Sequence, residues 1–365
     1  MSPFGAKRLS DYRIKDDPEK ILHSHSIDAA QEAFYKAIKT ARTNRKSDST
    51  ARFPYKRKFY RTTIWKTSGI RRRDGVLLLS KSRGSEPIVV PFDLEGEIRE
   101  VRLVFDLKQR RHFWHFVIED GKIPPPHPGE NVAAGDLGEI HPIALSDEEE
   151  ACVISCRELR SIAQGANKNL ARIQAKLSKC QKGSRRSKRL KRVKRNLLAK
   201  RKRRQRDLLH KVSRSAINWC VERKVGILAI GDVRDVADKT KEEKRLNREN
   251  RQKISNWPHG MLRQYLNYKA EESGIRIHDD VSERYTSQTC LSCGHRHKPK
   301  GRIYRCPKCE FEFARDGVGA ANILSRFKYG ELAKAKPRVC KYRRPFQRWN
   351  GLRSQADTLH VANAS

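Results

Sequence analysis

Four cysteines occur as two Cys-x-x-Cys pairs, Cys290 with Cys293 and Cys306 with Cys309. Two such pairs supply the four thiolates of a tetrahedral Zn2+ site, and the Gly, Lys and Pro residues between them are typical of a short hairpin. Because four thiolates leave no open position for water, this Zn2+ would be structural, and any chemistry must lie nearby. Asp316, at the start of an expected helix soon after the second pair, is the nearest acidic candidate.

A second acidic residue, Asp136, lies in the sequence Gly-Asp-Leu-Gly at residues 135–138, on an expected strand. A single aspartate in this setting is as typical of a turn as of a site. Metal-assisted phosphodiester cleavage requires carboxylate oxygens that converge on hard cations, and two aspartates rarely hold two ions. The two aspartates therefore form a site only if the fold unites them with a third acid.

The composition favours a polyanionic partner. Lys and Arg number 81 against 42 Asp and Glu, which gives a formal net charge of +39, more than solubility requires. Nucleic acid is the expected partner. There is no apolar run of spanning length and no signal peptide over residues 1–17, so we expect a soluble, intracellular protein without a membrane partner.

The N-terminal part combines one helical pattern with several strand patterns. The helix is expected over residues 27–46, and β-branched and aromatic residues predict strands at 76–79, 88–92, 101–105 and 113–118. We expect a small helix-plus-barrel module. Residues 53–65 interleave bases with aromatics, which suits phosphate contacts and base stacking, although a core hairpin with solvated Lys and Arg is the alternative.

The following segments predict one mixed sheet. Three short strands at 132–137, 142–145 and 151–154 indicate an antiparallel meander. A helical stretch over 155–220, broken at 182–184, indicates a hairpin whose basic face suits phosphates, a solvated face being the alternative. A strand at 225–230, a helix at 257–273 and a strand at 275–278 come next. This order matches an RNase H-like sheet with an insertion.

These motifs together resemble the TnpB family, the RuvC-type RNA-guided nucleases of insertion-sequence transposons that are ancestral to type V CRISPR effectors. Residues 135–138 match the first RuvC motif, and residues 285–290 with the two cysteine pairs match the zinc ribbon. Residues 315–316 and 319–323 match the third RuvC motif. The similarity runs from about residue 27 to about residue 325 and so covers most of the chain.

The resemblance implies a multidomain α+β (α/β) chain. A helix-plus-β-barrel module that binds RNA and DNA would span residues 1–130, and an RNase H-like RuvC nuclease domain would span 131–326. The basic helical hairpin at 155–222 and the four-cysteine zinc ribbon at 286–313 would be inserted in that domain. A basic, largely disordered tail would occupy residues 327–365.

The resemblance also implies the activity. A guide noncoding RNA and a double-stranded DNA target would be the partners, in the prokaryotic cytoplasm at the nucleoid. One RuvC site would cut both DNA strands with Mg2+ as the catalytic ion, while base pairing reads the sequence.

Two departures from the family pattern bear on this prediction. Only a short polar stretch precedes residue 27, where family members have a further strand and helix, so guide binding could suffer. The second departure is chemical, because Gly231 stands at the end of the buried strand where the middle RuvC motif normally has Glu. The chain therefore resembles a branch of the family that lacks this Glu and supplies it from the helix expected here at residues 257–273.

Several acids could replace the missing carboxylate. Asp232 would point to the opposite face of the strand, and Asp235 lies in a loop. On the helix at 257–273, Glu272 falls on the side of Met261 and Tyr265 that should face the sheet, whereas Glu271 falls opposite. We therefore predict Asp136, Glu272 and Asp316 as the catalytic acids, with a solvated Glu272 as the alternative.

Two other functions remain possible at this level. Without a replacement acid, the chain would be a nuclease-inactive, guide-directed DNA-binding protein or repressor, or a decayed transposase-associated protein. The triplet His23-Ser24-His25 superficially suggests the paired-histidine metal site of transposases that join strands through a covalent tyrosine, although no strand pattern surrounds it.

Overall fold

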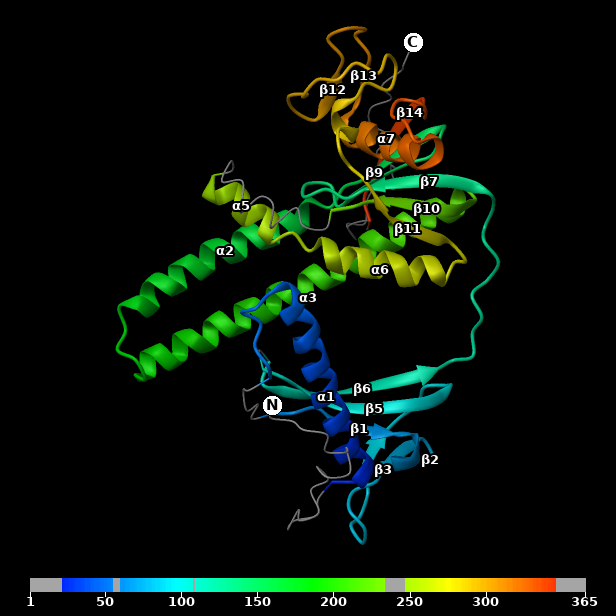
Figure 1. The fold of residues 1–365 in the computed structure, drawn as a ribbon. Coiled ribbons are helices and arrows are strands. Elements are labelled where there is room, and N and C mark those ends of the chain that lie inside the picture. The colour runs from blue at the N-terminus through cyan, green and yellow to red at the C-terminus, as the bar shows by residue number, and fades with distance from the viewer. Residues whose placement is uncertain (1–21, 55–59, 108, 234–246, 346–365) are drawn as a thin grey trace, which may run out of the picture. The chain divides into compact units, whose positions relative to one another are not determined.

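The computed structural model describes residues 22–54, 60–107, 109–233 and 247–345, and the chain divides into two compact units, Met1–Ile123 and Pro124–Ser365 (Figure 1). The fold is a mixture of helices and strands, as predicted from the sequence. No helix within the described ranges is long and apolar enough to cross a membrane. Asp235 and part of the basic, aromatic stretch at 53–65 lie outside the described residues.

The described residues of the first unit form one α-helix and six strands. They are α1 (Ser24–Ser47), β1 (Thr63–Lys66), η2 (Thr67–Gly69), β2 (Ile70–Arg73), β3 (Val76–Leu79), β4 (Ile88–Pro91), β5 (Glu97–Asp106) and β6 (Arg111–Glu119). The helix and four of the strands overlap the ranges predicted from periodicity, whereas β1 and β2 were not predicted. The strands form two three-stranded antiparallel sheets, β1-β5-β6 and β2-β3-β4. The ladders between described residues do not join these sheets into the expected closed barrel, because the chain turns through η2 between β1 and β2.

The two small sheets share one apolar core. Trp65, Leu77, Leu79 and Val101 are buried in it, and the Trp65 Nε1 donates a 2.8 Å hydrogen bond to the Ser80 carbonyl. The indole of β1 is thereby tied to the residue that follows β3, which links the two sheets.

The second unit is built on a six-stranded sheet with the order β11-β10-β7-β8-β9-β14. The strands are β7 (Asn131–Asp136), β8 (Ile143–Ser146), β9 (Glu150–Ile154), β10 (Val225–Gly231), β11 (Arg276–Val281) and β14 (Val339–Arg343). The meander β7-β8-β9 is antiparallel, β10 and β11 run parallel to β7, and β14 runs parallel to β9. The carboxyl ends of β7, β10 and β11 therefore meet at one edge.

Alternate residues of the sheet face different helices. Ala133 and Leu228 pack with α3 (Arg185–Glu222) and α6 (His259–Glu271), whereas Ala134 and Ala229 pack with α7 (Arg315–Tyr329). Figure 1 shows α7 and α6 on opposite sides of the sheet. Because side chains alternate along a strand, Asp136 and Gly231 point to the α7 side.

The expected helical hairpin is present between β9 and β10. It consists of α2 (Arg157–Ser178) and α3, and the Ser184 hydroxyl caps α3 by accepting from the Ser187 amide at 3.2 Å. Most of the lysines and arginines in the first half of α3 are exposed, whereas Leu209, Val212 and Ile217 in its second half are fully buried. The short α5 (Arg248–Ser255) precedes α6.

The chain after β11 forms a small ribbon and then returns to the sheet. The ribbon contains η3 (Thr286–Gln288), β12 (Ile303–Arg305) and β13 (Glu312–Ala314), and β12 pairs antiparallel with β13. The prediction of a disordered tail from residue 327 is wrong up to Arg343, because α7 continues to Tyr329 and β14 joins the sheet edge. Residues 346–365 lie outside the described part of the chain.

Candidate functional site

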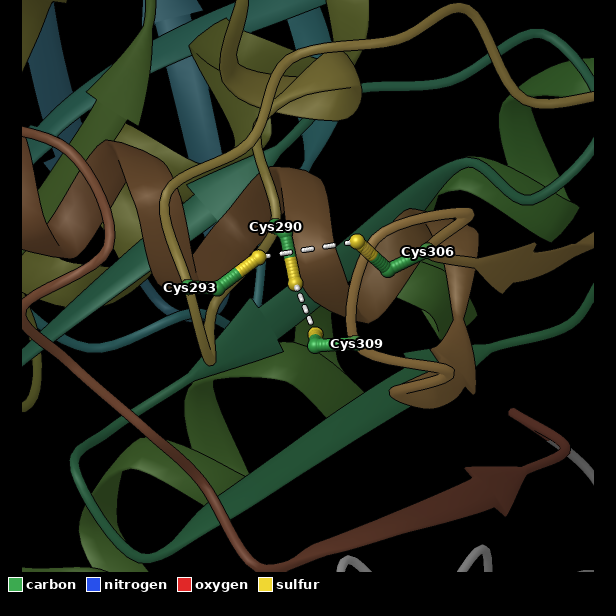
Figure 2. Close-up of side chains that lie close together, drawn as sticks. All are labelled: Cys290, Cys293, Cys306 and Cys309. Atoms are coloured by element: carbon green, nitrogen blue, oxygen red, sulfur yellow. Dashed lines mark hydrogen bonds between the residues drawn. The ribbon is translucent and has the colours of Figure 1, made fainter.

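The four cysteines of the ribbon converge on one point (Figure 2). Their sulfur atoms all lie within 4.8 Å of one another, with 3.7 Å between Cys290 and Cys309 and 3.6 Å between Cys293 and Cys306. Tetrahedral Zn2+ with bonds of about 2.3 Å places its sulfur ligands about 3.8 Å apart, so the cluster has the size of a Zn2+ site.

The two halves of the cluster are built alike. Gly294 N donates to the Cys290 carbonyl and Glu310 N to the Cys306 carbonyl, each at 3.0 Å, and both donor residues have positive φ. These turns aim both sulfurs of each pair inward, which confirms that the four cysteines predicted from their spacing lie together. Among the described residues, no other set of three or more His, Cys, Asp or Glu side chains is this compact.

Asp136 ends β7 and faces α7. A Cβ atom at Gly319 of α7 would lie only 2.2 Å from the Asp136 Oδ2, so the carboxylate fits because residue 319 has no side chain. Burial, followed by the negative charge of Asp316, raises the pKa of Asp136 to about 7. A carboxyl with this pKa interacts unfavourably with its surroundings when ionised and would be stabilised by a cation.

Asp316 lies in the first turn of α7, one turn before Gly319. Its Oδ1 is 3.4 Å from the Arg302 guanidinium, and its Oδ2 is 4.0 Å from the His141 Nε2. Burial lowers the pKa of His141. The structure thus brings Asp136 and Asp316, taken from distant parts of the sequence, into electrostatic contact.

The third acid of this group is Glu283, which follows β11. A Cβ atom at Gly231 would lie 2.1 Å from the Glu283 Oε1, so the Glu283 carboxylate occupies the space where a side chain at position 231 would begin. Burial, then the charges of Asp136 and Asp232, raises the pKa of Glu283 to about 8. Its Oε1 is buried and has no hydrogen-bond partner among the described residues.

Glu272 lies elsewhere, and its predicted place beside the two aspartates is wrong. It caps the C-terminus of α6, its side chain is half exposed, and it pairs with Arg214 of α3 at 2.9 Å. The helical wheel identified the side of α6 that packs on the sheet, but α6 covers the face opposite to Asp136.

Asp232 behaves as the strand periodicity predicted. It points toward α6, where the buried Arg263 lies 3.7 Å from its carboxylate and also pairs with Asp279. Arg263 therefore ties the ends of β10 and β11 together behind Glu283.

Sequence reasoning missed Glu283, although one signal could have found it. The carboxyl ends of neighbouring parallel strands meet at one edge of a sheet. Because β11 pairs parallel with β10, the first acid after β11 is placed beside the end of β10, where the acid is missing.

The histidine triplet at residues 23–25 has a local role. The His23 side chain caps α1 by accepting from the His25 amide at 3.3 Å, and the His25 ring contacts the Ser68 hydroxyl. This use of the two rings gives no support to a paired-histidine metal site.

Two family models match this chain. Residues 115–237 match a family described as a probable transposase (OrfB, IS605 type), and residues 259–323 match a Cas12f1-like TNB domain. The chain is similar to a TnpB-like protein of Methanocaldococcus jannaschii, at 24% identity over 218 residues that cover 58% of this chain and 74% of that protein.

Other similarities point in the same direction. A CRISPR-associated endodeoxyribonuclease Cas12f1 of Sulfoacidibacillus thermotolerans is 28% identical over 120 residues, which cover 31% of this chain and only 25% of that protein. Among solved structures, a Cas12f1–sgRNA–target DNA complex aligns over 82% of this chain and 70% of that chain, with a TM-score of 0.50. At 14% identity, this similarity shows a shared fold.

Proposed function

Because the chain is a member of the TnpB family, we propose that it is an RNA-guided DNA endonuclease that hydrolyses phosphodiester bonds at one site formed by Asp136, Glu283 and Asp316. The observation that carries this proposal is the convergence of the three acids on the α7 side of the sheet edge. Glu283 takes the place of the predicted Glu272.

The second unit would be the RuvC nuclease domain of RNase H-like fold. The order of the sheet supports this assignment. The antiparallel meander β7-β8-β9 is extended beside β7 by the parallel strands β10 and β11, and helices cover both faces. The α2–α3 hairpin would be its basic insertion and the cysteine ribbon its zinc ribbon. The domain limits 131–326, 155–222 and 286–313, with the N-terminal module over 1–130, are part of this proposal.

The chemistry of the three acids fits divalent cations. Carboxylate oxygens are the donors that Mg2+ prefers. The raised pKa values of Asp136 and Glu283, and the Glu283 Oε1 without a hydrogen-bond partner among the described residues, indicate that the ionised carboxylates lack a stabilising partner that a cation would supply. When bound, Mg2+ would supply an activated water and neutralise the leaving oxygen. The residues themselves would set the geometry: Gly319 and Gly231 leave room for two carboxylates, and Arg302 orients the third.

The basic surfaces would hold nucleic acid. Exposed lysines and arginines along the first half of α3 would neutralise the backbone of a guide noncoding RNA or of its duplex with target DNA. The solved Cas12f1 relative is a complex with sgRNA and target DNA, which supports these partners. Pairing with the guide would read the double-stranded target, and the protein would act in the prokaryotic cytoplasm at the nucleoid.

The proposal is tested by cleavage of a plasmid library in which randomised sequence flanks a guide-matched target. The protein is co-expressed with the noncoding RNA from its own locus and assayed with Mg2+, with an Asp316→Asn variant alongside. Guide-dependent cutting by the parent and not by the variant supports the proposal. Guide-dependent binding without cutting by the parent would instead favour the nuclease-inactive, guide-directed DNA-binding protein.

A further inference from the structure

The buried ring of His141 lies beside the proposed catalytic acids and has no assigned role. His141 is 7% exposed and stands in the loop between β7 and β8, where Gly138 N donates to the Pro142 carbonyl at 3.3 Å. A Cβ atom at Gly138 would lie 2.6 Å from the His141 carbonyl, so this tight loop depends on glycine. The loop begins directly after Asp136 and therefore fixes His141 relative to the site.

The two ring nitrogens of His141 have different surroundings. Nε2 faces Asp316 Oδ2 at 4.0 Å, whereas Nδ1 is buried and has no hydrogen-bond partner among the described residues. A buried N–H without a partner is costly, so the tautomer with its proton on Nε2 is favoured. That proton would face the Asp316 carboxylate, at a distance longer than a direct hydrogen bond.

Asp316 therefore has a nitrogen-bearing side chain near each of its carboxylate oxygens. Arg302 lies near Oδ1 and His141 near Oδ2. Two donors on opposite oxygens fix the plane of a carboxylate, and donors to ligating carboxylates commonly tune metal affinity.

The C-terminal strand supports the His141 ring. Tyr342 of β14 meets it edge-on, with ring centroids 6.0 Å apart and an interplanar angle of 70°. The ladders pair Asp136 with Ala144, Ala144 with Val153, and Val153 with Tyr342, so Tyr342 and Asp136 end one row of side chains on the α7 face. The row therefore carries Tyr342, which touches the His141 ring, and the proposed acid Asp136 on the same face of the sheet.

β14 is anchored well enough to act as this support. Arg338 N donates to the Glu149 carbonyl at 2.9 Å, and Ser155 N donates to the Arg343 carbonyl at 2.8 Å. Lys341 pairs with Glu150, and Arg343 pairs with Glu222 at 2.6 Å.

We propose that His141 is a positioning residue for Asp316, and that β14 belongs to the functional site because Tyr342 holds the His141 ring in place. This inference rests on the proposed function, in which Asp316 is a ligand of the divalent cations. It assigns a role to a strand that lies beyond the residues matched by either family model.

The test measures Mn2+ binding to the full-length, zinc-containing protein by electron paramagnetic resonance, with thermal melting to check folding. His141→Asn should weaken Mn2+ binding about 10-fold or more. His141→Gln, whose amide nitrogen reaches the position of Nε2, should retain more affinity than His141→Asn. Tyr342→Ala should also weaken Mn2+ binding, but by a smaller factor than His141→Asn.

Matched controls lie on the same elements or carry the same change. Val339→Ala removes a partly buried side chain from β14, and His278→Asn removes an imidazole from β11 that packs on Phe327. Both should keep the affinity of the parent. If Asp316→Asn abolishes Mn2+ binding but a folded His141→Asn variant keeps the Mn2+ affinity of the parent, this inference is overturned while the proposed function stands. A parent that binds no Mn2+ at this site would overturn it together with the proposed function.

Discussion

The carboxylate of Glu283 fills the space that a side chain at position 231 would enter, since a Cβ atom there would lie 2.1 Å from Oε1. The glycine at the end of β10 is therefore complementary to an acid delivered from the end of β11. The Glu283 carboxylate can occupy this place because residue 231 has no side chain.

Gly231 and Glu283 should show compensation. Gly231→Glu alone should abolish cleavage, because two side chains would compete for one space and add a further buried charge. Combining it with Glu283→Ala should restore part of the activity, since the new glutamate would enter from the adjacent strand. Cleavage rates of both single variants and the double variant form the cycle. A double variant no more active than Gly231→Glu would count against complementarity.

Gly319 should tolerate no side chain. Gly319→Ala places a methyl group 2.2 Å from the Asp136 Oδ2, so the carboxylate must move and cleavage should fall by at least about 10-fold, a barrier change of roughly 1.4 kcal/mol. Gly260→Ala in α6 is the matched control, because its Cβ would meet nothing within 4 Å and alanine favours a helix by about 1 kcal/mol. Equal cleavage by the two variants would contradict the packing argument.

The paired carboxyls should make stability depend on pH. The pKa values of Asp136 and Glu283 are raised from 3.8 and 4.5 to about 7 and about 8, so the folded chain holds these protons more tightly than the unfolded chain. Their contribution to the free energy of unfolding is complete below about pH 4 and is lost as the pH rises through about 8. Without added Mg2+, the melting temperature should therefore decline over this range.

The Asp136→Asn variant should decline less, and added Mg2+ should stabilise the parent most at high pH. Glu272→Gln should follow the parent, because Glu272 is half exposed and lies on the other face of the sheet. If the melting temperature of Asp136→Asn fell with pH as steeply as that of the parent, Asp136 and Glu283 would not titrate as described.

The four-cysteine ribbon should support Glu283 through its base. The buried Asn322 donates to the carbonyls of Thr286 and Thr289 at 2.7 and 2.8 Å, and the Thr286 hydroxyl donates to the Glu283 carbonyl at 2.9 Å. Asn322→Ala leaves two buried carbonyls unpaired and should lower the free energy of unfolding by about 2–4 kcal/mol.

Cys306→Ser should lower bound zinc, measured by elemental analysis, and lower cleavage as well. If the zinc-depleted protein cleaved DNA as well as the parent, the ribbon would not be needed to position Glu283.

Much of the fold could be predicted from the sequence, because the elements have clear periods and end signals. The clustering of the four cysteines was predicted from a short-range pattern that depends little on packing, whereas Asp136 and Asp316 were proposed from the family resemblance. The place of Glu272 was predicted wrongly, since a helical wheel shows which side of α6 is apolar but not which face of the sheet it covers. The position of Glu283 depends on the pairing of β11 with β10, which no local pattern around Glu283 shows. β14 was also missed, because Lys341 and Arg343 make it polar and it is stabilised by pairing with the distant β9.

The most direct test of the account compares Glu283→Gln with Glu272→Gln in guide-dependent plasmid cleavage at matched protein, RNA and Mg2+ concentrations. Both changes remove one negative charge at constant size, and the two glutamates lie only eleven positions apart in the sequence. We predict that Glu283→Gln binds target DNA but does not cut it, whereas Glu272→Gln cuts like the parent. Cleavage by Glu283→Gln together with its loss in Glu272→Gln would contradict the account.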